Sequence, residues 1–257
     1  MKKIFFVLGS FTIVSFVFIL LMSSRYKKTD ALHVPVPAPK GFAVMELFTS
    51  QGCSSCPPAD KLLGKYAQKN DERIIPIAFH VDYWNRLGWK DPFSNPEYTR
   101  RQENYSGLFL NASVYTPQLI INGQKEMVGS DETKIEKSIA AALAEGSAVS
   151  ITIKNITAAD NAITIQYSLE GSIAETSVRA VLIQNKVATK IKAGENGGVL
   201  LTNYNVVRDL ISSDAAAEGN CVLHIPENIP AKDFSVVLFT QNTGTGKITG
   251  AIKKPLP

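Results

Sequence analysis

Two cysteines separated by two residues, in the stretch QGCSSCPPAD (residues 51–60), constrain the fold more than any other feature of this sequence. The segment before them, GFAVMELFTS, is rich in apolar residues and predicts a buried strand. The segment after them, ADKLLGKYAQK, carries apolar residues near helical spacing. Pro57 and Pro58 suit the first turn of that helix, because backbone N–H groups there have no partner in any case. The order strand, CxxC, helix predicts an α/β unit.

The segments that follow extend the α/β pattern to residue 146. RIIPIAFHVDYW is apolar almost throughout and predicts a second, parallel strand. A polar and aromatic insert comes next, and its part at 96–105 is expected to be helical. VYTPQLIINGQKEMVG predicts a hairpin that turns at Asn122-Gly123, and DETKIEKSIAAALAEG predicts a final helix. We therefore expect one α/β domain over residues 41–146, with a helical insert.

From residue 147 the sequence changes to segments in which apolar and polar residues alternate. SITIKNITAADNAITIQYSLEG predicts a hairpin with its turn at 158–161. SVRAVLIQNK and DFSVVLFTQNT predict two more strands, and a short helix is expected at 205–211. Residues 147–257 are therefore expected to form a smaller, antiparallel β-rich domain.

The N-terminal segment predicts export. Two lysines precede the run 4–22, whose 19 uncharged residues are many for a signal-peptide core and close to the length of a membrane span. For residues 1–28 we favour an uncleaved anchor over a cleaved signal peptide, and either of these over a buried core helix. Residues 29–40 alternate proline with small or apolar residues and predict an extended linker. Export would place the protein in the periplasm or another extracytoplasmic space, membrane-anchored or secreted, where disulfides persist.

The charge distribution argues against a nucleic-acid partner. The net charge is +4, but residues 1–40 alone carry six basic side chains and one acidic side chain. Residues 41–146 carry 11 basic and 13 acidic side chains, and residues 147–257 carry 10 and 9. Because the positive charge lies in the leader and linker, the rest of the chain has no basic footprint for nucleic acid.

The position of Cys53 and Cys56 favours redox chemistry. Cys53 directly before a helix would face unpaired N–H groups and the positive end of the helix dipole, which stabilise the reactive thiolate. Cys56, one turn later, can then attack a mixed disulfide and release the partner. A structural staple is less favoured, because closing so short a loop restrains little chain entropy. Metal binding by the two thiolates is the other alternative.

A threonine–proline pair lies about 60 residues after the cysteines, where Thr116-Pro117 opens a predicted strand. A CxxC at a helix start, followed by this pair, resembles the thioredoxin superfamily. The resemblance implies that Pro117 follows a cis peptide bond and lies against the cysteines. It also implies that the backbone of Thr116 pairs with the substrate chain.

Longer motifs narrow the resemblance. They are MELFTSQGCSSCPPAD, AFHVDYWNRLGWKDPFSNPEYTRRQENY, VYTPQLIINGQ with VGSD, and GEN with NVVR. Together they are similar to domain-of-unknown-function family 1223, a family of exported bacterial proteins described as thioredoxin-like. This resemblance implies a fold and a compartment, but no substrate.

Two titratable residues near the cysteine motif are further candidates. Glu46, seven residues before Cys53, is a candidate for the buried acid of thioredoxins, which accepts a proton from the second cysteine, although the spacing differs from theirs by one residue. His80 ends the second predicted strand, where the sites of α/β proteins gather. It can act as a general base, as a partner of a thiolate, or as a metal ligand. An exposed carboxylate and a half-buried, hydrogen-bonded histidine are the structural alternatives.

Two other residues stand out for different reasons. Trp84, in an aromatic and basic loop, can line a partner cleft, although packing is the interpretation we favour. Cys221 stands alone in the β-rich half, where we expect a buried small hydrophobe rather than a second redox thiol.

These observations lead to three hypotheses. We favour an exported thiol–disulfide oxidoreductase that acts on exported proteins bearing disulfides or thiols, with Cys53 as nucleophile and Cys56 as resolving cysteine, and without a cofactor. Contact with a membrane is expected only through an uncleaved N-terminal segment. The alternatives are a copper-type module in which Cys53, Cys56 and His80 hold a soft ion, and a non-catalytic thioredoxin-fold scaffold.

Overall fold

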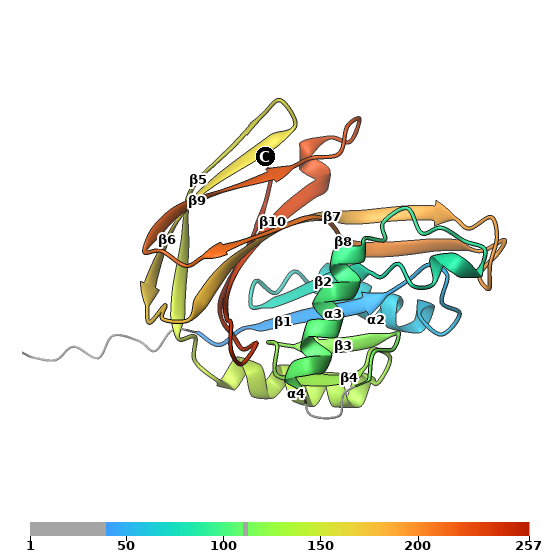
Figure 1. The fold of residues 1–257 in the computed structure, drawn as a ribbon, viewed down its shortest axis with the longest axis horizontal. Coiled ribbons are helices and arrows are strands. Elements are labelled where there is room, and N and C mark those ends of the chain that lie inside the picture. Colours follow the sequence, from blue (N-terminus) through green and yellow to red (C-terminus); the bar gives the residue numbers. More distant parts are fainter. Residues whose placement is uncertain (1–39, 110–112, 257) are drawn as a thin grey trace, which may run out of the picture. The chain divides into compact units, whose positions relative to one another are not determined.

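The computed structural model describes residues 40–109 and 113–256, and Figure 1 shows their fold. The predicted leader at 1–28 and all of the predicted linker except Lys40 lie outside the described residues. Within the described ranges, no helix is both long enough and apolar enough to cross a membrane.

Eleven strands, three α-helices and two short 3-10 helices make up the described part of the chain. The first half contains β1 (Ala43–Thr49), α2 (Pro57–Lys69), β2 (Ile74–His80), η1 (Asn85–Leu87), α3 (Pro96–Leu108), β3 (Gln118–Ile121), β4 (Lys125–Val128) and α4 (Glu132–Ala144). The second half contains β5 (Val149–Ala159), β6 (Ala162–Gly171), β7 (Thr176–Lys190), β8 (Leu200–Asp214), β9 (Glu218–His224), η2 (Ala231–Asp233), β10 (Phe234–Asn242) and β11 (Ile248–Pro255).

Eight of the strands form one mixed sheet in the order β11-β10-β7-β8-β2-β1-β3-β4. The strands β1 and β2 run parallel, and their last residues, Thr49 and His80, are register partners. Strands from both halves of the sequence share this sheet, because β8 joins β2 where Val206 lies beside Ala78. The sheet therefore continues across the expected boundary between residues 146 and 147. The remaining strands, β5, β6 and β9, form an antiparallel sheet of three strands.

The helix expected at 205–211 is wrong, because these residues lie within β8. Val206 and Val207 are buried β-branched residues, which fit a pleated sheet better than a helix. They pair with Gln184 and Ile183 of β7. Asn205 has a positive φ of 50°, and its side-chain amide donates to the carbonyl of Pro76 at 2.8 Å. Sheet pairing therefore decides the conformation of this segment.

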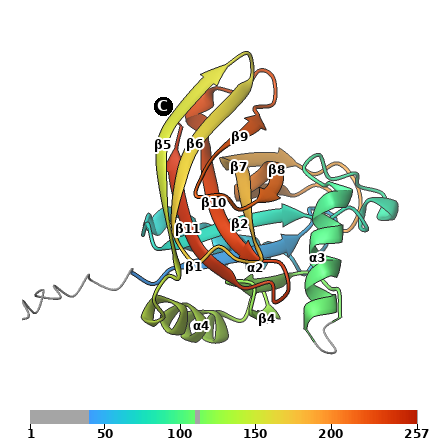
Figure 2. The ribbon, with the colours of Figure 1, turned by 60° about the vertical axis from the view of Figure 1, so that its left-hand side comes forward.

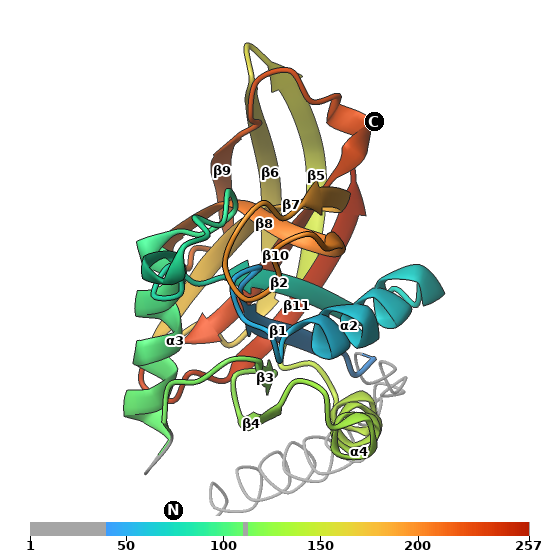
Figure 3. The same ribbon diagram turned by 90° about the vertical axis from the view of Figure 1, so that its right-hand side faces the viewer.

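The large sheet is covered on both faces. One face packs with α3 around a core that includes Phe48, Phe79 and Tyr105. The other face carries α2 and α4, around a core that includes Leu47 and Leu62. Figure 3 shows α2 and α3 on opposite sides of β1 and β2. A third core joins the three-stranded sheet to β7 and β10, and Figure 2 shows β5 and β6 beside β10 and β11.

A close approach between Gly64 and Tyr204 fixes the packing of α2 on β8. A Cβ atom added to Gly64 would lie 2.6 Å from the Tyr204 ring, which is closer than a side chain can approach. The helix that begins at the cysteine pair is thus held against a strand from the second half of the chain.

We expect Gly64→Ala to destabilise the protein by about 1–3 kcal/mol, because the added methyl group overpacks the contact with Tyr204. Gly107→Ala is the matched control, since this exposed glycine of α3 has no atom within 4 Å of the added Cβ atom. The control should be stabilised by about 0.5–1 kcal/mol through helix propensity. Urea unfolding of both variants measures the difference, and an unchanged or raised stability for Gly64→Ala would contradict the packing.

Candidate active site at the Cys53–Cys56 disulfide

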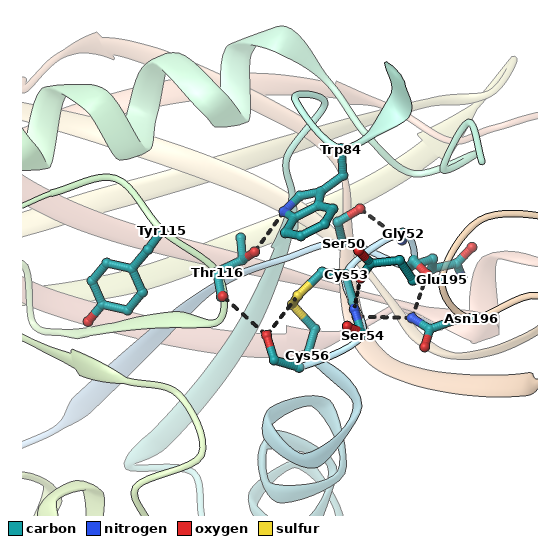
Figure 4. Close-up of a disulfide and its surroundings, with 12 residues drawn as sticks. Ser50, Gly52, Cys53, Ser54, Cys56, Trp84, Tyr115, Thr116, Glu195 and Asn196 are labelled. Atoms are coloured by element: carbon teal, nitrogen blue, oxygen red, sulfur yellow. Dashed lines mark hydrogen bonds between the residues drawn. A yellow bond between two sulfur atoms is a disulfide. The ribbon is translucent and has the colours of Figure 1, made fainter. Parts of the chain in front are cut away.

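Cys53 and Cys56 form a disulfide at the start of α2, with their Cα atoms 5.4 Å apart (Figure 4). Cys56 is the N-cap residue of the helix, and its carbonyl accepts from the backbone N–H of Asp60 at 3.1 Å. Both cysteines are buried, whereas Ser54 and Ser55 between them are exposed. The expected position of Cys53 before the first helical turn is therefore confirmed.

Thr116 and Trp84 lie beside the disulfide. The Thr116-Pro117 peptide bond is cis, as the resemblance to thioredoxins implies. The carbonyl of Thr116 accepts from the Ser55 hydroxyl at 3.5 Å, and the Thr116 hydroxyl accepts from the indole N–H of Trp84 at 2.8 Å. Figure 4 shows the side chains of Trp84 and Thr116 close to the two cysteines. The structure thus brings together four of the residues that the sequence indicated.

A loop from the second half of the chain holds the cysteine segment in place. The carboxylate of Glu195 accepts from the backbone N–H of Ser54 at 3.1 Å. The side-chain amide of Asn196 donates to the carbonyls of Gln51 and Cys53, both at 2.9 Å. The bond with Ser54 holds the pKa of Glu195 below its ordinary value. The sequence indicated this GEN segment only as part of a family motif, and it gave no signal for the contact with Cys53.

Glu46 does not face the helix that begins at the cysteines. It is fully buried on the α3 face of β1, where its two carboxylate oxygens accept from Arg101 Nε at 2.6 Å and from the Tyr105 hydroxyl at 2.5 Å. Burial raises the pKa of Tyr105, so that its hydroxyl keeps the proton that it donates. Since β1 side chains alternate between the two faces, the same strand directs Thr49 toward α2 instead. Glu46 therefore belongs to a buried ionic cluster.

His80 is fully buried at the end of β2 and is held by Asp91. Its Nδ1 atom lies 2.7 Å from Asp91 Oδ2, and Asp91 also accepts from the backbone N–H groups of Gln51 and Phe93. Burial alone would lower the pKa of His80, but the charges of Asp91 and Asp60 outweigh it and raise this pKa. Burial would likewise raise the pKa of Asp91, but His80 and the N–H groups hold it below its ordinary value. His80 and Asp91 accordingly form a buried pair that favours the protonated imidazole.

Asp60 is a titratable residue near the disulfide that the sequence did not indicate. It lies one helical turn after Cys56 and is only 6% exposed. Burial, partly opposed by the charge of His80, raises the pKa of Asp60 to about 6. The available signal was a carboxylate four residues after the second cysteine, a spacing that places both residues on one helix face.

Three buried side-chain atoms, one of them on Asp60, make no hydrogen bond of ordinary length and angle within the described part of the chain. They are Thr49 Oγ1, Asp60 Oδ1 and His80 Nε2. Thr49 and His80 are register partners on the strand face that packs against α2, and both influence the pKa of Asp60. Buried polar atoms without partners are rare in proteins and often mark a catalytic role or an internal water. The three groups thus form a polar cluster beneath the start of α2.

The sequence also raised a metal site and a second redox thiol as candidates, and the described residues assemble neither of them here. No three His, Cys, Asp or Glu side chains among residues 40–109 and 113–256 are grouped as metal ligands, so Cys53, Cys56 and His80 are not assembled into one ligand set. Cys221 is a free thiol, 2% exposed, in the core of the three-stranded sheet. Burial raises its pKa, as expected for a thiol that packs as a small hydrophobe.

Comparisons with known proteins identify relatives of this chain. The family model described as "Protein of unknown function (DUF1223)" matches residues 44–241. The crystal structure of protein AGR_C_4864 from Agrobacterium tumefaciens is similar, with a TM-score of 0.64 and 29% identity over 84% of this chain and 94% of that chain. A domain of the outer membrane lipoprotein Omp28 from Porphyromonas gingivalis has a TM-score of 0.27 and 12% identity over 43% of this chain and 88% of that one, which is too low to support an inference. No curated protein matches the chain.

We expect Asp60→Asn to stabilise the protein at pH 8 and to leave its stability at pH 4 nearly unchanged. The folded state raises the pKa of Asp60 from 3.8 to about 6 and so favours the protonated acid. The stability that this preference contributes is full below pH 3.8 and is lost as the pH rises through 6. The variant should gain on the order of 1–3 kcal/mol at pH 8, as measured by urea unfolding.

Asp71→Asn is the control for this comparison. Asp71 is partly exposed, and its hydrogen bonds with Arg73 lower its pKa, so its replacement should slightly lower the stability at pH 8. A loss of stability at pH 8 in both variants would show that Asp60 is not a destabilised buried carboxylate.

Proposed function

The chain belongs to the DUF1223 family of proteins of unknown function, and we propose that it is an exported thiol–disulfide oxidoreductase whose redox pair is Cys53 and Cys56. The observation that supports this most is the disulfide at the N-terminus of α2, with the Thr116 carbonyl on one side and a buried acid one turn further along the helix. We assign a thioredoxin-like arrangement to β1, α2, β2, the β3–β4 hairpin and α4. The apolar leader supports a periplasmic or other extracytoplasmic location, anchored or secreted.

The reaction requires only the two cysteines and a partner protein. In the reduced protein, the Cys53 thiolate attacks a disulfide of an exported partner, and one partner sulfur leaves as a thiolate that takes up a proton. Cys56 then attacks Cys53 Sγ, which releases the second partner sulfur and forms the Cys53–Cys56 disulfide. Two electrons pass to the partner, and the reverse sequence oxidises a partner dithiol. The positive end of the α2 dipole favours the Cys53 thiolate, and the Ser55 hydroxyl lies 3.4 Å from Cys53 Sγ.

Asp60 is the group that we assign to the proton of Cys56. A thiol must lose its proton before it attacks, and a buried carboxylate with a raised pKa accepts a proton more readily than an exposed one. The positive charge of His80, fixed by Asp91, limits the cost of a charged Asp60 in the interior. Glu46 is a poorer candidate for this role, because Arg101 and Tyr105 occupy both of its oxygens on the other face of the sheet.

The surroundings of the disulfide support a partner that binds as an extended chain. The carbonyl of Thr116 faces Ser55, and its pairing with a partner backbone would replace the weak bond to the serine hydroxyl. Trp84 lies against the cysteine loop, since a Cβ atom added to Gly52 would be 3.3 Å from Trp84 Cβ. Cys53 is buried, and Glu195 and Asn196 bind the backbone of the cysteine segment, so they oppose any movement of this segment that would expose Cys53. These contacts give the protein a means of restricting access to Cys53.

Cys56→Ala in a Cys221→Ala background should accumulate mixed disulfides through Cys53 when the full chain is expressed with its leader. The variant retains the nucleophile but lacks the thiol that resolves the covalent intermediate. Non-reducing electrophoresis followed by reduction measures the trapped adducts.

Cys53→Ala in the same background is the matched control, and it should form few adducts, because Cys56 is the resolving thiol and lacks the position before the helix that activates Cys53. An absence of adducts in the Cys56→Ala protein under both reducing and oxidising growth conditions would overturn the proposal. The remaining account would then be a non-catalytic scaffold with a structural disulfide.

A further inference from the structure

A cavity of about 550 Å³ lies on the α3 face of the large sheet, apart from the face that carries α2. Its walls come from α3, from β7, β8 and β10, and from the turn after β10. Figure 1 shows α3 crossing this side of the sheet. Three arginines line the cavity, namely Arg100, Arg101 and Arg179. The role proposed for Cys53 and Cys56 makes no use of these residues.

Two of these arginines already have an acidic partner. Arg101 pairs with the buried Glu46 at 2.6 Å. Arg100 pairs at 3.4 Å with Glu97, an exposed acid of α3 that also lines the cavity. Arg101 also donates to Gln241 Oε1 at 3.3 Å and to the Tyr105 hydroxyl at 3.0 Å. The charges of these two guanidinium groups are therefore balanced within the protein.

Arg179 has no acidic partner within the described residues. Its Nε atom donates to Gln241 Oε1 at 2.8 Å, so the same neutral oxygen serves two guanidinium groups. The terminal nitrogens of Arg179 make no hydrogen bond within the described part of the chain. The Arg179 side chain lines the cavity. Burial, and then the nearby charge of Arg101, lower the pKa of Arg179. The protein therefore supplies only part of the hydrogen bonds, and no opposite charge, for this half-buried guanidinium group.

We propose that this cavity binds a small anion that bears a carboxylate or phosphate group and that the anion pairs with Arg179. Guanidinium groups bind both anions through two parallel hydrogen bonds, which matches the two free terminal nitrogens. Polar side chains of Asn104, Ser212 and Thr243 line the same space and can complete the coordination of the oxygens. Leu108 and Leu210 also line the cavity, so they can contact the short apolar part of an organic acid.

The register of β7 and β8 offers a direct way to test this site. Arg179 and Ser212 are partners on adjacent antiparallel strands, so their side chains lie on the same face. Ser212→Asp would place a carboxylate opposite Arg179 and occupy the position of the bound anion. Ser212 is exposed, so this substitution should not disturb the core.

Isothermal titration of the full chain with inorganic phosphate and with hexanoate tests the proposal. We expect at least one of these probes to bind the wild-type protein with a dissociation constant of about 1 mM or tighter. Arg179→Gln should weaken that binding at least tenfold, since it removes the charge-assisted hydrogen bonds. Ser212→Asp should weaken it to a similar extent and should also raise the thermal midpoint of the anion-free protein. Hexanoate binding would indicate an organic acid, and preference for phosphate would indicate a phosphorylated ligand.

Arg73→Gln is the control, because it removes the same charge from an exposed arginine that pairs with Asp71 outside the cavity. Its affinity for the probe should equal that of the wild-type protein. Two results would overturn the proposal: neither probe binds the wild-type chain, or both cavity variants bind as the wild-type protein does. A raised midpoint of Ser212→Asp would also show that a loss of binding in this variant does not come from unfolding.

Discussion

The parallel pairing of β1 with β2 is the constraint on which the site depends. It places Thr49 and His80 side by side at the carboxyl ends of two buried strands. Because side chains alternate along a strand, the same pairing directs Glu46 to the opposite face, toward Arg101 of α3. The polar cluster under α2 and the ionic cluster under α3 are therefore two consequences of one strand register.

The two clusters differ in how completely their polar atoms are hydrogen-bonded. Arg101 and Tyr105 occupy both carboxylate oxygens of Glu46, an arrangement typical of a buried group that serves the fold. Asp60 and His80 each retain an atom without a hydrogen bond in the described structure, and both have raised pKa values. Incomplete satisfaction costs stability, and proteins often accept such a cost where chemistry needs a titratable group. This contrast is the physical reason for assigning the proton of Cys56 to Asp60.

Local patterns predicted the elements near the cysteines, but not the contacts between distant segments. The start of a helix at Pro57 and the turn at Asn122-Gly123 follow from local residue chemistry, so they were predictable. Alternation along β1 shows that Glu46 and Thr49 face opposite ways, yet it does not show which face α2 covers. The bonds from Asn196 to the cysteine loop join residues more than 140 positions apart, and no local pattern encodes them. Pairing with β7 likewise overrode the helical expectation for the segment that contains Val206.

The most direct test of the central claim is the reduction potential of the Cys53–Cys56 pair, measured at equilibrium in thiol–disulfide buffers. A pair that exchanges electrons with protein partners should equilibrate with these buffers and have a potential above about −300 mV. Comparing this potential with that of the thiol–disulfide pool in its compartment would then show whether Cys53 donates or accepts electrons. A pair that remains oxidised at potentials well below −300 mV would be a structural disulfide, and it would contradict the proposed redox function.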